Sequence, residues 1–139
     1  MKVFLDTNVL LDALVRRDNP QFTDDASLIL ELGYDGVCDL CMSVLSVPTI
    51  AYVLKSLSPV QKQRILHDLS AIVTLLPSLP DHVSAVLENP VPDIEDALQL
   101  QSALQGSCDL ILTRDPSGFA ASALPVLTPS AFLSRILSA

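Results

Sequence analysis

The segment Val3-Phe4-Leu5-Asp6-Thr7-Asn8 joins three apolar residues directly to a carboxylate, a hydroxyl and an amide. A short, unbroken apolar run is typical of a strand buried on both faces, as in a parallel sheet. The polar residues then follow the carboxyl end of that strand, which is where ligands bind in open α/β sheets. Asp6 has no Lys or Arg directly beside it, so its carboxylate requires a metal, a cation or a hydrogen-bond donor.

Apolar runs alternate with helical patterns along the rest of the chain. The expected strands are residues 3–5, 37–42, 71–76, 110–112 and 125–127, and the expected helices are 9–15, 24–32, 44–57, 59–69, 82–88, 93–104 and 129–137. This order predicts right-handed βαβ crossovers and an α/β fold: a three-layer α/β/α sandwich with a central parallel sheet of four to five strands, the first beside the fourth. We expect one domain, residues 1–139.

Capping side chains define several of these helix boundaries. Thr23 is the expected N-cap of the second helix, and Asp81 is the expected cap of the helix that ends before Asn89-Pro90. Ser58-Pro59 and Thr128-Pro129 each place proline directly after a residue that can cap a helix, which favours a helix start at both positions.

The composition excludes one broad class of protein. Half of the residues are hydrophobic but only 4% are aromatic, so we expect an aliphatic core. The net charge of −8 argues against a general nucleic-acid binder, because affinity for phosphates comes mainly from Lys and Arg. The charge is still compatible with an enzyme that meets phosphates through bound cations.

Three observations bear on localisation. No apolar run approaches the ~18 residues that a membrane helix needs, and Met1-Lys2 leads directly into a strand, so we expect neither a membrane segment nor a signal peptide. The three cysteines are an odd number. With no sign of secretion, the odd number predicts reduced thiols in a cytoplasmic protein. Cys38 and Cys41 would point to opposite faces of a strand, so they cannot bind one metal together and are expected to be buried structural thiols.

Acidic side chains recur where the expected strands end or the expected helices begin. Asp6 follows the first strand, Asp93 and Asp96 lie at the start of a helix, and Asp115 follows the fourth strand. If the first and fourth strands are neighbours, these carboxylates converge at one edge of the sheet. Such carboxylates repel one another unless a cation intervenes, and an oxygen-rich site of this kind suits Mg²⁺ or Mn²⁺.

Each acid also has a purely structural interpretation. Asp93 is typical of an N-cap, with Asp96 completing a pair that resembles a capping box. Asp115 precedes Pro116 as in an Asp-Pro turn, and Asp6 suits an Asx turn at the end of a strand. Arg114 is either a solvated loop cation or a contact to phosphate.

Three motifs in register resemble those of the PIN-domain ribonucleases, and in particular the VapC class of bacterial toxins. They are Leu5-Asp6-Thr7-Asn8-Val9-Leu10-Leu11, Asp96-Ala97-Leu98, and Thr113-Arg114-Asp115 with Phe119 following. The resemblance covers nearly the whole chain. It implies an α/β/α sandwich that cleaves single-stranded RNA with Mg²⁺ or Mn²⁺, acting as a toxin held by an antitoxin protein.

The resemblance also implies roles for individual residues. Asp6, Asp96 and Asp115 would be metal ligands, while Asn8 and Thr113 would orient ligands or water. One departure is that Thr49 stands where the family usually has a Glu. Asp93 or Glu95 is a candidate to compensate for that missing charge, although Glu95, directly beside Asp96, is expected to point to one side.

Two other functions compete with this interpretation. A PIN-like binding module with a weakened site, acting through a partner, is favoured by Thr49 and by the acidic charge. A phosphoryl-transfer protein is disfavoured, because Asn8 replaces the second acid of a phosphatase Asp-x-Asp motif and no Lys follows Lys62. We further expect a homodimer or antitoxin surface on the apolar segment 131–137 and around Tyr52 and Leu54.

Overall fold

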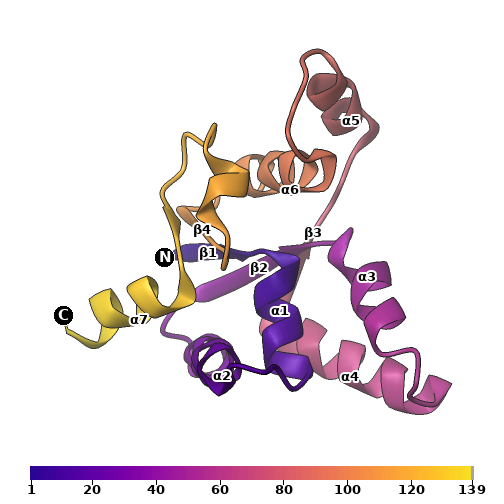
Figure 1. Cartoon of the computed structure of the whole chain (residues 1–139), viewed down its shortest axis with the longest axis vertical. Helices are drawn as coiled ribbons and strands as arrows, with labels where there is room; N and C mark the ends of the chain where they lie inside the picture. The colour runs from indigo at the N-terminus through magenta and orange to yellow at the C-terminus, as the bar shows by residue number, and fades with distance from the viewer. Residues whose placement is uncertain (139) are drawn as a thin grey trace.

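The computed structural model describes residues 1–138, which form a five-stranded parallel sheet between helical layers (Figure 1). The strands are β1 (Lys2–Leu5), β2 (Asp39–Ser43), β3 (Val73–Leu76), β4 (Leu110–Leu112) and β5 (Val126–Leu127). The helices are α1 (Thr7–Leu14), α2 (Pro20–Tyr34), α3 (Ser46–Val53), α4 (Pro59–Ile72), α5 (Pro80–Leu87), α6 (Ile94–Gln105), the 3-10 helix η1 (Pro116–Phe119) and α7 (Pro129–Leu137). The predicted three-layer α/β/α sandwich is confirmed.

β1 lies at the centre of the sheet, whose strand order is β3-β2-β1-β4-β5. Val3 lies opposite Leu40 of β2 on one side and opposite Leu110 of β4 on the other, and both pairings are parallel. The predicted contact between the first and fourth strands is therefore confirmed. Because the order of strands reverses at β1, the loops after β1 and β4 meet at the carboxyl edge, where a crevice for ligands is expected.

Successive residues of the strands enter two separate cores. Val3 and Leu5 belong to the larger core, which α1, α2 and α7 cover, whereas Phe4 belongs to the core beneath α6 and η1. Figure 1 shows α6 on the opposite side of the sheet from α1 and α2. Cys38 lies in the first core and Cys41 in the second, as the strand pattern predicts. Full burial of a side chain such as Phe4 contributes about 1.5–3 kcal/mol.

Several helices begin where the sequence predicts. Ser58 caps α4 in a capping box with Gln61, with Pro59 in the first turn. Asp93 caps α6 through its Oδ1, which accepts from the amide of Asp96 at 2.9 Å. Thr128 caps α7 through a 3.1 Å hydrogen bond from the amide of Ala131. Each cap satisfies an amide that the first turn of a helix leaves unpaired.

Other predicted boundaries are wrong. Asn19, not Thr23, caps α2, because Pro20 occupies the first helical position instead of only ending the preceding helix. α3 covers Ser46–Val53 and is shorter than the predicted 44–57. Leu79 occupies the N-cap position of α5 in place of Asp81, and its amide donates to Nδ1 of the buried His82.

The two apolar surfaces expected to bind a partner are partly internal. Phe132 and Leu133 of α7 and Leu54 are buried in the larger core, so these residues stabilise the fold instead of forming an exposed face. Tyr52 and Leu137 do remain exposed, at 67% and 66%. No helix within residues 1–138 combines the length and apolarity that a bilayer crossing requires.

Candidate carboxylate site

Asp6 forms the floor of the candidate site at the carboxyl end of β1. Its amide donates to the carbonyl of Leu112 at 3.0 Å, which continues the pairing of β1 with β4. Its two carboxylate oxygens accept from the Thr7 amide and from Oγ1 of Thr113, both at 2.7 Å. Burial raises the pKa of Asp6 above its ordinary value of 3.8 and the charge of Glu95 adds to this, although both hydrogen bonds act to lower the pKa.

Thr113 connects the loops that follow β1 and β4. Its hydroxyl donates to Asp6 and accepts from Nδ2 of Asn8 at 3.3 Å and from the amide of Asp115 at 3.1 Å. Asn8 in turn accepts from the amide of Arg114 at 3.3 Å. Thr113 is fully buried, so this hydroxyl has a fixed set of partners. Thr113 is therefore bonded to the Asp6 carboxylate and to the Asp115 backbone, and Asn8 supports it through Thr113 and the Arg114 amide.

Asp96 extends the site from the first turn of α6. Its backbone is held by the cap from Asp93, and its carboxylate lies directly against Gly118 of η1. A Cβ at Gly118 would overlap the Oδ2 atom of Asp96, so the backbone of η1 and this carboxylate can approach each other only because residue 118 has no side chain. The bare backbone of η1 therefore makes room for the Asp96 carboxylate.

The acidic side chains of the two segments act on one another electrostatically. Burial, followed by the charges of Asp6, Asp93, Glu95 and Asp115, raises the pKa of Asp96 from 3.8 to about 7. A carboxylate surrounded by four like charges resists ionisation unless a cation is present. The acids predicted to converge therefore share one electrostatic environment, and Glu95 belongs to it as well.

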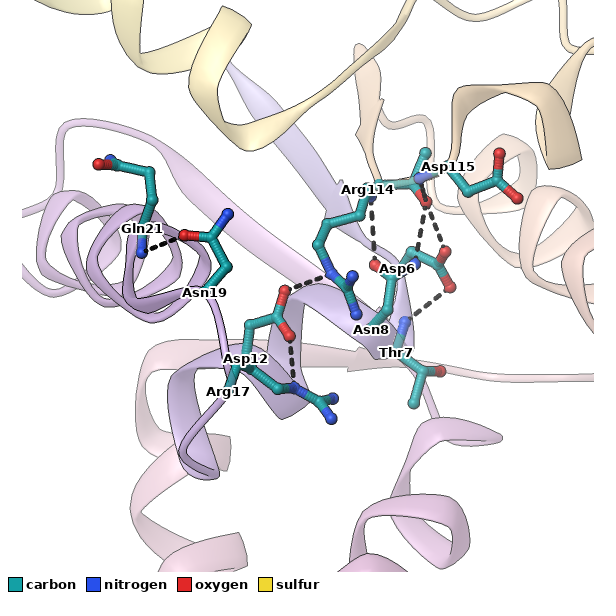
Figure 2. Close-up of polar contacts among 10 residues, drawn as sticks. Asp6, Thr7, Asn8, Asp12, Arg17, Asn19, Gln21, Arg114 and Asp115 are labelled. Carbon is teal, nitrogen blue, oxygen red and sulfur yellow. Dashed lines mark hydrogen bonds and ion pairs between the residues drawn. The ribbon is translucent and has the colours of Figure 1, made fainter.

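Asp115 lies at the exposed edge of this environment. It precedes η1, and its Oδ1 accepts a hydrogen bond from the hydroxyl of Ser117. Figure 2 shows its carboxylate directed away from the floor of the site. Within residues 1–138, no three acidic, His or Cys side chains already form a ready ligand set for one ion. Direct binding of an ion by Asp6, Asp96 and Asp115 together requires their side chains to adjust.

A buried polar network that the sequence analysis missed joins three helices below the site. Oγ1 of Thr7 contacts Oγ of Ser46 on α3 at 2.7 Å and accepts from Nε2 of Gln99 on α6 at 2.9 Å. Nε2 of Gln99 also lies 3.3 Å from Glu95, four residues earlier, a spacing that places both on one face of the helix. The fully buried Oε1 of Gln99 has no hydrogen-bond partner within residues 1–138.

Arg114 takes part in a buried ion-pair cluster, not in a solvated loop. Its Nε lies 2.6 Å from Oδ2 of Asp12, and Nε of Arg17 donates to Oδ1 of the same carboxylate at 2.7 Å (Figure 2). Only 1% of the Asp12 side chain is exposed. The Arg114 guanidinium also lies over the ring of Phe22, 4.5 Å from its centre. Arg114 therefore anchors the segment between Thr113 and Asp115 to α1 and α2.

Comparison with known families agrees with these features. The family model described as PIN domain matches residues 2–117 of this chain. The chain therefore belongs to the PIN domain family, which confirms the resemblance seen in its three motifs.

Individual relatives support the same assignment. The chain is 33% identical over 143 residues to Ribonuclease VapC1 from Aquifex aeolicus (strain VF5), and the match covers 96% of this chain and 94% of the relative. Among solved structures, it resembles VapBC2 from Rickettsia felis bound to a promoter DNA fragment, with a TM-score of 0.64, 13% identity and coverage of 92% and 98%. A toxin-antitoxin complex from Klebsiella pneumoniae gives a TM-score of 0.64, 21% identity and coverage of 91% and 97%. At these identities, the structural matches establish the fold alone.

Proposed function

We propose that this protein is a ribonuclease that cleaves phosphodiester bonds of single-stranded RNA with Mg²⁺ or Mn²⁺, and that it is the toxin of a toxin-antitoxin pair. The observation that carries the proposal is the gathering of carboxylates from the end of β1, from α6 and from the loop after β4, whose charges add to burial in raising the pKa of Asp96 to about 7. The relative named Ribonuclease VapC1 supports the type of reaction, since the match extends over nearly the full length of both chains.

The donor set is compatible with a hard divalent cation. Asp6, Asp96 and Asp115 offer carboxylate oxygens, which Mg²⁺ and Mn²⁺ prefer as ligands. A cation would also relieve the repulsion that, in addition to burial, raises the pKa of Asp96. Asp93 would be a peripheral ligand, because its Oδ1 is already occupied by the α6 cap. The residues are therefore of the right chemical type for such an ion, and their side chains would have to move toward it when it binds.

The residues of the carboxylate site would have different roles in the reaction. Asp6 is fixed by two hydrogen bonds, so it presents the least mobile carboxylate. Thr113 and Asn8 hold Asp6 and the backbone around Asp115 in register. Asp96 would contribute its charge once it has lost its proton. The bound cation would supply positive charge for the phosphodiester and lower the pKa of a hydrolytic water.

The acidic charge of the chain has a consequence for RNA binding. With a net charge of −8, the protein offers few cations to the phosphate backbone, and Arg114 and Arg17 are already paired with Asp12. Attraction of the substrate would therefore depend on the bound metal more than on Lys and Arg. Added salt should weaken cleavage less than it weakens binding by a basic protein.

An antitoxin is the proposed protein partner, acting with the toxin in the cytoplasm. The structural relatives include VapBC2 and a toxin-antitoxin complex, and the fold matches both at a TM-score of 0.64. The three cysteines of the chain are free and buried, as suits a reducing compartment.

A catalytically weakened binding module is the second candidate, and Thr49 favours it. Thr49 lies half-buried on α3, the helix that begins at Ser46 in contact with Thr7. A hydroxyl there contributes no charge to a second metal ion. If that charge limits the reaction, Thr49→Glu should increase the metal affinity or the cleavage rate.

Cleavage of a labelled single-stranded RNA tests the proposal. Wild type, Asp115→Asn and Thr49→Glu are compared with and without Mn²⁺. Asp68→Asn, which removes one carboxylate from the exposed face of α4, is the control. We expect Mn²⁺-dependent cleavage by wild type and Asp68→Asn, a loss of at least about 100-fold in Asp115→Asn, and an increase in Thr49→Glu. Unchanged cleavage by Asp115→Asn would refute the proposed site. No cleavage by any variant would favour the binding module.

A further inference from the structure

A cavity of about 210 Å³ opens beside the carboxylate site, between the α5–α6 connection and η1. Its walls include Val86 of α5, Leu100 of α6 and Phe119 of η1. Val86 and Phe119 are almost fully buried, so these apolar walls are fixed by the packing of the fold. The cavity is smaller than the 300–1,000 Å³ typical of sites for whole drug-sized ligands, so it suits one ring-sized group of a larger molecule.

The charge of the cavity selects against an anion. Its lining includes Asp93 and Asp96 but no Lys or Arg. A phosphate in this position would therefore meet repulsion without a compensating cation. A neutral, partly apolar ring is the chemical class that these walls favour.

Two amides provide polar groups for such a ring. Asn89 and Gln101 both line the cavity, and neither side chain forms a hydrogen bond with the described part of the chain. Each amide can donate two hydrogen bonds and accept others. Apolar walls with a few convergent donors and acceptors are typical of sites that orient a ring by its edge.

The cavity and the carboxylate site share residues. Asp93, Asp96 and Gly118 line the cavity, and the same Asp96 carboxylate lies against Gly118 under the influence of Asp6 and Asp115. A group bound in the cavity is therefore adjacent to the position at which the scissile phosphate must meet the carboxylates. In an RNA strand, the flat aromatic ring nearest to a phosphate is the base of an adjoining nucleotide, since the ribose between them offers no such ring.

We propose that this cavity binds one unpaired nucleobase next to the cleaved phosphodiester, and that Asn89 and Gln101 determine which base is preferred. The proposal rests on the ribonuclease function proposed above. Recognition of single-stranded RNA commonly uses bases that are turned out of the stack, held by apolar contacts and read at their edges by hydrogen bonds. Only unpaired RNA can offer a base in this way, which accounts for the expected substrate class.

An abasic scan tests whether a base occupies the cavity. The substrate is a single-stranded RNA in which one nucleotide at a time, near the cleavage position, carries ribose without a base. We expect the kcat/KM of wild type to fall about tenfold or more at one position adjoining the cut, and to change little at distant positions. Equal rates at every position would overturn the proposal while leaving the ribonuclease function intact.

Two variants test the residues that read the base. Gln101→Met and Asn89→Leu keep the approximate size of each side chain and remove its hydrogen-bonding groups. We expect a changed base preference at the sensitive position, and a loss of rate that shrinks on the abasic substrate. Gln63→Met, on the exposed face of α4, is the control and should keep the base preference of wild type. If both variants keep that preference as well, these amides do not read the base.

A binding measurement separates this proposal from the function on which it rests. The side-chain amide signals of Asn89 and Gln101 are followed by NMR as free adenosine, guanosine, cytidine or uridine is added to the metal-free protein. Shifts at these two amides would support the cavity even if no RNA is cleaved. No shift with any nucleoside, in a protein that cleaves RNA without dependence on the adjoining base, would overturn it.

Discussion

Asp96→Asn should stabilise the metal-free protein at pH 8, although it removes a residue proposed to act in catalysis. Burial and the surrounding acids raise the pKa of Asp96 to about 7, so its ionised form is disfavoured in the folded state. Asn has a similar shape and never ionises. The substitution therefore removes a penalty from the folded protein, and the Asp96 carboxylate has no side-chain hydrogen bond within residues 1–138 to lose in exchange.

The direction and size of the effect follow from proton linkage. Between the ordinary pKa of 3.8 and the folded value of about 7, folded Asp96 retains a proton that the unfolded chain has lost. Its contribution to stability therefore decreases as the pH rises through this window, and the full penalty is present above pH 7. The pKa difference corresponds to about 4 kcal/mol. Because Asp96 is partly accessible, solvent screening reduces this to about 1–2 kcal/mol.

Thermal and urea unfolding in the presence of chelator measure this effect. At pH 8, Asp96→Asn should raise Tm by about 3–6 °C, and the gain should shrink toward zero as the pH falls to 4. Asp68→Asn, at an exposed acid of α4, should give no pH-dependent gain. Added Mn²⁺ should raise the Tm of wild type more than that of Asp96→Asn, since metal binding to the folded state stabilises it. A variant less stable than wild type at pH 8 would refute the reasoning.

Two further substitutions follow from contacts around the site. Gly118→Ala places a methyl group against the carboxylate of Asp96. The rise in Tm on adding Mn²⁺ should therefore become smaller than in wild type. An equal rise would show that this carboxylate does not take part in metal binding. Arg114→Met leaves the buried Asp12 with one of its two cations and should lower the free energy of unfolding by about 2–3 kcal/mol in urea titrations. Arg16→Met, at an exposed cation in the same region, should change it by less than about 0.5 kcal/mol, and equal losses in the two variants would argue against the ion pair.

Local sequence signals predicted the parts of the fold that depend on neighbouring residues. The fourth strand was predicted with its observed bounds, because an apolar run before a polar triplet leaves little choice of register. The caps at Ser58, Asp93 and Thr128 were also predicted correctly, since each cap bonds to an amide only three residues away. Where two residues can cap, as at Asn19 and Thr23, position alone did not decide, and the proline after Asn19 was the neglected signal.

The remainder depended on contacts between residues far apart in the chain. The hydrogen bond between Thr7 and Ser46 joins residues 39 positions apart, and that between Gln99 and Thr7 joins residues 92 apart. Asp12 had no predictable role, because its partner Arg114 follows a strand that only the folded sheet brings close to α1. The approach of Asp6 and Asp115 to one edge of the sheet was expected from strand order, whereas the contact of Asp96 with Gly118 required the fold itself.

The central position of β1 also bears on how the protein would lose its function on heating. The strand that leads into Asp6 is paired on both edges, and the Asp6 amide is itself bonded to Leu112 of β4. Amides at such positions exchange with solvent mainly when the whole domain unfolds. The floor of the site therefore cannot open by local fraying, in contrast to the exposed connection at residues 88–93. Heat inactivation and global unfolding should follow a single transition.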